Sequence, residues 1–168
     1  MKGQVLGFRF QVLGMAVLAL VVGASAHDIS FGDVPAKKAH VVLLSDGVDV
    51  AAGKAQVVEL RFRVEPGFHI NSHAPKDPLL IATALKLDTG HGVDVQGVDY
   101  PKGSAFQLGL GKDAQMLDVY QGEFRVRVRM IADAGNSTMT GMLHYQACDD
   151  AACFPPKNLV VKVAVTGK

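Results

Sequence analysis

The sequence predicts an all-β fold, an antiparallel β-sandwich, because polar and apolar residues alternate along several short segments that turn residues separate. Glycine occurs 18 times, which suits many strands joined by turns. Hydrophobic residues make up 49% of the chain, enough to build a packed core. After the amino-terminal region no segment has a convincing helical pattern.

The amino-terminal region has the pattern of a secretory signal peptide. Lys2 and Arg9 are basic, residues 12–23 are apolar and uncharged, and Ala24-Ser25-Ala26 fits a small-x-small cleavage site. An uncleaved anchor is the alternative, but the apolar run is shorter than the ~20 residues that span a bilayer. We therefore expect residues 1–26 to be removed and residues 27–168 to form one exported, soluble domain without a membrane anchor.

Charge is nearly balanced, with a formal net charge of +1. This does not favour nucleic acid as a partner, because phosphate binding needs a clustered basic surface. Arg125, Arg127 and Arg129 alternate with apolar residues. Their spacing indicates the solvent-facing side of a strand and not a basic binding patch.

Several segments are predicted as strands, and 56–65 and 122–131 are the clearest because apolar and charged residues strictly alternate in them. In 159–165 every second residue is apolar as well. A helical turn also fits 79–87, but the surrounding strands favour a strand there. The predicted strands are 39–44, 56–65, 68–72, 79–87, 92–100, 122–131, 138–147 and 159–165.

Three connections matter for the topology. Asp46-Gly47 is predicted as a turn, and Ala134-Gly135-Asn136 is predicted to join 122–131 and 138–147 as a β-hairpin. Residues 101–115 contain several glycines and are expected to form a loop. That length is unusual in a compact domain, and long ordered loops often carry function.

Cys148 and Cys153 are the only cysteines, and four residues separate them. Because they end one predicted strand and precede another, we expect them to face each other across a turn, with Cα atoms about 4.4–6.8 Å apart in a disulfide. Closing so short a loop stabilises a fold by only about 2 kcal/mol. In an exported protein the pair is either a structural bridge or a redox centre, and a metal site would need further ligands.

The residues around the cysteines modify this chemistry. Asp149 and Asp150 place negative charge between the sulfurs, which opposes thiolate formation and suits a passive carrier better than a strong oxidant. Phe154-Pro155-Pro156 then stiffens the chain, because proline fixes φ and lacks an N–H donor. An aromatic flank held in this way can shield the sulfurs.

The segment from Tyr145 to Pro156, with its Tyr-Gln-x-Cys and Cys-aromatic-Pro-Pro pattern, resembles the N-terminal periplasmic domain family of the thiol:disulfide interchange protein DsbD. Residues 67–87 and Val119-Tyr120-Gln121-Gly122 resemble the same family. The resemblance implies an immunoglobulin-like sandwich, a periplasmic location and a redox-active cysteine pair. One departure is the cysteine spacing, since the best-known member has one residue more between its cysteines.

The same resemblance implies roles for individual residues. Cys153 would form the mixed disulfide with a partner and Cys148 would resolve it, with Tyr145, Asp149, Asp150, Phe154 and Pro155 surrounding the pair. An aromatic cap residue is expected on the 101–116 segment, and Phe106 is the candidate, with Leu108 or Leu110 as alternatives. The implied partners are thioredoxin-like periplasmic proteins, namely disulfide isomerases and cytochrome-c maturation factors. Since the chain shows one domain, a separate membrane reductant is expected to supply electrons, making the protein a component of a disulfide reductase without a cofactor.

Other constellations give competing hypotheses. His69 and His73 could bind a metal only if the chain bends, because residues i and i+4 of a strand lie about 13 Å apart. His27 would be the amino-terminal residue after cleavage and could chelate copper through its amine and ring. The remaining alternative is an exported β-sandwich binding module with an inert structural disulfide.

Overall fold

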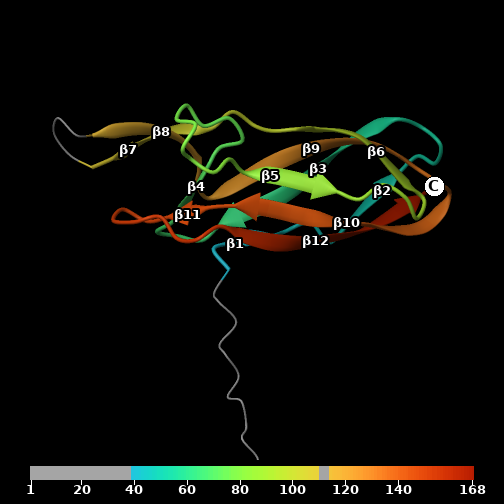
Figure 1. Ribbon diagram of the computed structural model, residues 1–168. Helices are drawn as coiled ribbons and strands as arrows, with labels where there is room; N and C mark the ends of the chain where they lie inside the picture. The colour runs from blue at the N-terminus through green and yellow to red at the C-terminus, as the bar shows by residue number, and fades with distance from the viewer. Residues whose placement is uncertain (1–38, 110–113) are drawn as a thin grey trace, which may run out of the picture. The chain divides into compact units, whose positions relative to one another are not determined.

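Strands form all the regular secondary structure in residues 39–109 and 114–168, the part of the chain that the computed structural model describes. In these residues the strands form three four-stranded sheets, A, B and C (Figure 1). No helix in these residues is long and apolar enough to cross a membrane. The predicted signal peptide and His27 lie outside the described residues.

Sheet A carries the two clearest predicted strands at its centre, and all its neighbouring strands are antiparallel. In spatial order it consists of β1 (Val41–Leu43), β3 (Gln56–Val64), β9 (Glu123–Ala132) and β6 (Val93–Asp99). The alternating apolar residues of β3 and β9 are buried and the charged residues between them are exposed, as the sequence predicts. A bulge between Val95 and Gly97 shifts the register of β6.

Sheet B faces sheet A across the core (Figure 1). In spatial order it consists of β2 (Gly47–Val50), β12 (Lys157–Gly167), β10 (Gly135–Tyr145) and β5 (Ala84–Leu87). β10 and β12 pair along their whole length, whereas β2 joins β12 in parallel. Gly141 allows β5 to approach β10, because a Cβ there would clash with the carbonyl oxygen of Lys86.

The core fills the space between sheets A and B. Phe62 and Phe124 stack with ring centroids 5.3 Å apart, and Met139, Leu143 and Val163 are fully buried on sheet B. Each such side chain contributes roughly 1.5–3 kcal/mol of burial free energy. Two packed layers of mainly antiparallel strands confirm the predicted β-sandwich, with an immunoglobulin-like arrangement.

Sheet C positions the cysteines at the end of the domain away from the carboxyl terminus (Figure 1). In spatial order it consists of β11 (Ala147–Cys148), β4 (His69–Asn71), β8 (Gln115–Tyr120) and β7 (Ser104–Leu108). All three pairings are antiparallel. Segments distant in sequence thus lie beside Cys148.

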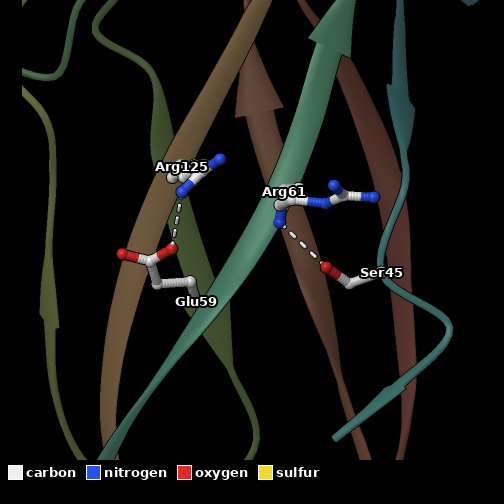
Figure 2. A network of polar contacts seen from close by, with 4 residues as sticks. All are labelled: Ser45, Glu59, Arg61 and Arg125. Atoms are coloured by element: carbon white, nitrogen blue, oxygen red, sulfur yellow. Dashed lines mark hydrogen bonds and ion pairs between the residues drawn. The ribbon is translucent and has the colours of Figure 1, made fainter.

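The outer face of sheet A is a solvated surface, as the sequence predicts. Figure 2 shows Arg125 Nη1 3.2 Å from Glu59 Oε2, and the backbone N–H of Arg61 donating to Ser45 Oγ at 2.9 Å. The Arg125 and Glu59 side chains are 61% and 49% exposed, so their ion pair contributes at most about 1 kcal/mol.

Two predicted connections are wrong. β9 and β10 belong to different sheets, so the turn at Ala134 and Gly135 carries the chain between layers and does not close a hairpin. Asp46-Gly47 is also not a simple turn, because Gly47 begins β2, which pairs with β12. Turn residues indicate a change of direction, but only packing of the flanking strands decides which sheet each one joins.

Two predicted elements also need correction. The loop expected at 101–115 contains β7 and reaches the start of β8, and these two strands pair from Ser104↔Val119 to Leu108↔Gln115. Of the strand predicted at 79–87, only Ala84–Leu87 is a strand. The residues before it bend around Asn71, whose side-chain Nδ2 donates to the carbonyl oxygen of Ile81 at 3.0 Å.

Candidate redox site at Cys148 and Cys153

Cys148 and Cys153 form a disulfide with an S–S distance of 2.05 Å. They lie directly opposite each other in an isolated antiparallel bridge, which confirms that they face each other across a turn. Their Cα atoms are 3.9 Å apart, closer than the expected range. The turn is tight because the N–H of Asp149 donates to the carbonyl oxygen of Ala152 at 3.0 Å, and that of Phe154 to Ala147 at 2.8 Å.

The two cysteines differ sharply in exposure. Cys148 is completely buried on β11, whereas Cys153 is exposed beyond the turn. Thiol–disulfide exchange begins with contact between two sulfurs, so access decides which sulfur an incoming molecule reaches first. In this conformation Cys153 is the accessible one.

Asp149 organises the turn between the cysteines. Its Oδ1 accepts hydrogen bonds from the N–H groups of Ala151 and Ala152, each at 2.8 Å. These two bonds, with that of Ala151 the larger cause, lower the pKa of the Asp149 carboxyl. The charged carboxylate therefore serves as a local cap for the turn, while Asp150 next to it is exposed.

The segments that flank the cysteines meet at His40, just before β1. Tyr145 is buried, and its hydroxyl accepts a hydrogen bond from the N–H of His40 at 3.3 Å. Phe154 directly follows Cys153, and its ring centroid is 5.2 Å from that of His40 and 5.8 Å from that of Phe68. Pro155, which follows, is exposed. The contacts of Tyr145 and Phe154 with His40 hold both ends of the cysteine segment against the sandwich.

Burial raises the pKa of the Tyr145 hydroxyl, although hydrogen bonds from the N–H groups of His40 and Val41 act in the opposite direction. The hydroxyl therefore stays neutral at physiological pH and has a positioning role. The sequence does not predict that His40 and Phe68 belong to this site, because their contacts with Tyr145 and Phe154 join segments about a hundred residues apart in the chain.

Phe106, the predicted cap residue, lies on the neighbouring part of sheet C. Its ring centroid is 4.2 Å from that of His69, and the planes are tilted by 34°. His69 lies directly opposite Cys148 in the β4–β11 register. The ring therefore covers the histidine beside the buried cysteine. Leu108 follows on β7, and Leu110 lies outside the described residues.

The two histidines considered for metal binding have different environments. His69 is 1% exposed within sheet C, whereas His73 is exposed and stacks on Tyr100 with ring centroids 3.7 Å apart. His73 Nδ1 also lies 2.9 Å from the carbonyl oxygen of Thr83. Residues 39–109 and 114–168 contain no cluster of three or more His, Cys, Asp or Glu side chains that could hold a metal ion.

Solved structures give matches of low identity. The chain resembles the reduced N-terminal domain of DsbD from Neisseria meningitidis with 20% identity and a TM-score of 0.42, over 65% of this chain and 77% of that one. It resembles the N-terminal periplasmic domain of ScsB from Proteus mirabilis with 16% identity and a TM-score of 0.47, over 73% of this chain and 43% of that one. A PapD-like domain of human CEP192 matches at 8% identity and a TM-score of 0.32, over 80% of this chain and 91% of that one.

Comparison with curated proteins gives no match. Comparison with protein families matches residues 42–165 to the family described as thiol:disulfide interchange protein DsbD, N-terminal. The match runs from β1 almost to the end of β12 and includes both cysteines. The chain therefore belongs to the family of the N-terminal domain of the thiol:disulfide interchange protein DsbD.

Proposed function

We propose that this protein is an exported thiol–disulfide exchange protein that passes reducing equivalents through Cys148 and Cys153 to disulfide-containing partners in the periplasm. The main support is the unequal exposure of the two sulfurs. Cys153 is exposed, whereas Cys148 is buried directly across the turn. One sulfur can meet a partner while the other is held where it can attack the first.

The proposed reaction has two steps. In the reduced protein the Cys153 thiolate attacks one sulfur of a partner disulfide, which forms a mixed disulfide and releases the other partner sulfur as a thiolate. Cys148 then attacks the Cys153 sulfur, which closes the Cys148–Cys153 disulfide and frees the partner as a dithiol. Two electrons move to the partner, and a donor dithiol must return them.

Membership of the DsbD N-terminal family supports thioredoxin-like partners. We propose periplasmic disulfide isomerases and cytochrome-c maturation factors as acceptors, and a separate membrane protein as the reductant. Tyr145 and Phe154 would hold the cysteine segment in place through His40, and Asp149 would set the turn. Pro155, Asp150 and Phe106 would shape the surface that meets the partner.

Replacing Cys148 with Ala tests this function directly. The variant cannot resolve the mixed disulfide, so Cys153 should remain covalently joined to its partner. We expect non-reducing electrophoresis and mass spectrometry of cells that express Cys148→Ala to show adducts with thioredoxin-like proteins. Cys153→Ala is the matched control and should trap none, because its remaining thiol is buried.

Two results would contradict the proposal. The first is that Cys148→Ala traps no adduct in cells and that the reduced protein also exchanges with no purified thioredoxin-like protein. The other is a reduction potential well below about −300 mV, which is typical of structural disulfides. Either result would favour a binding module with an inert bridge.

A further inference from the structure

We infer that His69 is the proton acceptor for Cys148 when Cys148 resolves the mixed disulfide. The inference rests on the proposed thiol–disulfide exchange and assigns a role to a residue outside the cysteine segment. Two geometric observations on the described residues carry it, namely the position of His69 opposite Cys148 and the unpaired ring nitrogen of His69, and the negative charges of the nearby turn support it.

The strand register brings the two residues together. Cys148 and His69 are paired residues of the antiparallel strands β11 and β4. Directly paired residues point to the same face of a sheet, with Cβ atoms about 4.5–5.5 Å apart. Both side chains are buried, at 0% and 1% exposure. A sulfur and an imidazole in these positions lie within reach of each other and are shielded from bulk water.

The ring has an unused hydrogen-bonding atom. His69 Nε2 is buried and has no hydrogen-bond partner among the described residues while the disulfide is closed. An unsatisfied buried polar atom is unfavourable and rare in folded proteins. Reduction would provide a partner, because Cys148 then carries an S–H group. The unpaired nitrogen is thus explained if its partner exists only in the reduced protein.

The electrostatic surroundings suit a base that is neutral before the reaction. Burial lowers the pKa of His69, while the negative charges of Asp150 and, less strongly, Asp149 oppose that shift. These aspartates come from the turn after β11. On β8, Tyr120 pairs with Ile70 and so points to the opposite face, and β7 contributes Phe106, which does not titrate. A neutral imidazole can accept a proton, and the aspartates stabilise the imidazolium that results.

The resolving step then balances without outside reagents. A buried thiol is mostly protonated at neutral pH, yet only the thiolate is a good nucleophile. The proton of Cys148 Sγ moves to His69 Nε2, and the Cys148 thiolate forms a bond to Cys153 Sγ. The bond between Cys153 and the partner sulfur breaks, and the leaving thiolate takes the proton from His69. Over the two exchange steps together the partner gains two electrons, and in the resolving step its second sulfur leaves as a thiol, so that the cysteine pair ends as a disulfide.

A small aromatic disulfide separates this inference from the function itself. Fully reduced protein is mixed in stopped flow with limiting 5,5′-dithiobis(2-nitrobenzoate), whose two thiolates are coloured. The first release reports attack by Cys153 and the second reports resolution by Cys148. His69→Gln should slow the second phase about 100-fold at pH 7 and leave the first unchanged. Since no protein partner is needed, the result does not depend on whether one exists.

The pH dependence of the second phase distinguishes proton transfer from packing. In His69→Gln the second phase should regain speed as pH rises and Cys148 ionises unaided, whereas the unsubstituted protein should depend less on pH. His73→Gln, at an exposed histidine outside the pair, is the matched control and should behave like the unsubstituted protein. An unchanged second phase in His69→Gln, or equal slowing of both phases, would overturn the inference.

A measurement on the unsubstituted protein covers the case in which His69→Gln does not fold. The ¹⁵N chemical shift of His69 Nε2 should change when the disulfide is reduced, because the nitrogen gains a hydrogen bond to Cys148. Identical Nε2 shifts in the oxidised and reduced proteins would overturn the inference.

Discussion

Asp149 shows how one carboxylate can define the geometry of a cysteine pair. Its Oδ1 accepts from the N–H groups of both Ala151 and Ala152, so a single side chain holds the inner part of the turn. Asp149→Ala should therefore remove the protection of these two amides from hydrogen exchange while the rest of the sandwich stays protected. Asp150→Ala is the matched control, since Asp150 occupies the same turn. Equal loss of protection in both variants would contradict this role.

The same residue gives a pH prediction with a definite sign. Hydrogen bonds from Ala151 and Ala152 lower the folded-state pKa of Asp149, so its contribution to the turn is present above the ordinary carboxyl pKa. It is lost as pH falls through the lowered folded value. After correction for intrinsic exchange rates, the protection of both amides should hold at neutral pH and fall in strong acid. Protection that stays constant through acid would show that the carboxylate charge is not needed.

At the scale of elements, the pair β7 and β8 determines which ring lies against His69, the residue that pairs with Cys148. β8 pairs with β4, and β7 pairs with β8, so the hairpin extends sheet C past His69. Phe106 then lies against the His69 ring. The expected loop is in fact an ordered strand, which makes it a better support for a cap, because strand pairing fixes the direction of its side chains.

Removing the ring tests whether Phe106 is the cap. In a Cys153→Ala background only Cys148 remains, and its alkylation by iodoacetamide measures access to the buried sulfur. Phe106→Ala should speed that alkylation several-fold because it uncovers His69 and the side of Cys148. Leu108→Ala, two residues along on the same strand face, should leave the rate unchanged. Faster alkylation with Leu108→Ala and not with Phe106→Ala would instead make Leu108 the cap.

For the whole molecule, the alternation of apolar and charged residues predicts the central strands, because a strand with one buried face needs an apolar residue at every second position. Leu60, Phe62, Val126 and Val128 are all buried, as expected. The alternation is weaker in β7, because Gly103 and Gly109 border this strand and its residues are exposed or half-buried. The cysteine pair could be predicted as a candidate redox site from the signal-peptide pattern and from the residues that flank the pair.

Relationships between strands were harder to predict. Ala134 and Gly135 reverse the chain as expected, but the same residues would serve a hairpin or a crossing between layers. The partnership of His69 with Cys148 depends on the register of β4 with β11, two strands nearly eighty residues apart. Such registers follow from the packing of the complete sandwich, so a local pattern does not reveal them.

The sandwich as a whole predicts how the protein responds to reduction. The core lies between sheets A and B, and Cys148 belongs to sheet C at the end of the domain. Opening a disulfide that closes so short a loop should reduce the free energy of unfolding by only about 2 kcal/mol. We therefore expect the reduced protein to remain folded and to unfold cooperatively in urea at a lower midpoint, as a working redox carrier must.

The control is the Cys148→Ala, Cys153→Ala double variant, whose urea midpoint should not depend on added dithiothreitol. The unsubstituted protein should show a shift between its oxidised and reduced forms with little change in slope, because the same core is exposed on unfolding. Loss of the cooperative transition on reduction would mean that the fold depends on the bridge. The disulfide would then be a structural element, and a protein that must open it in every cycle could not function as an electron carrier.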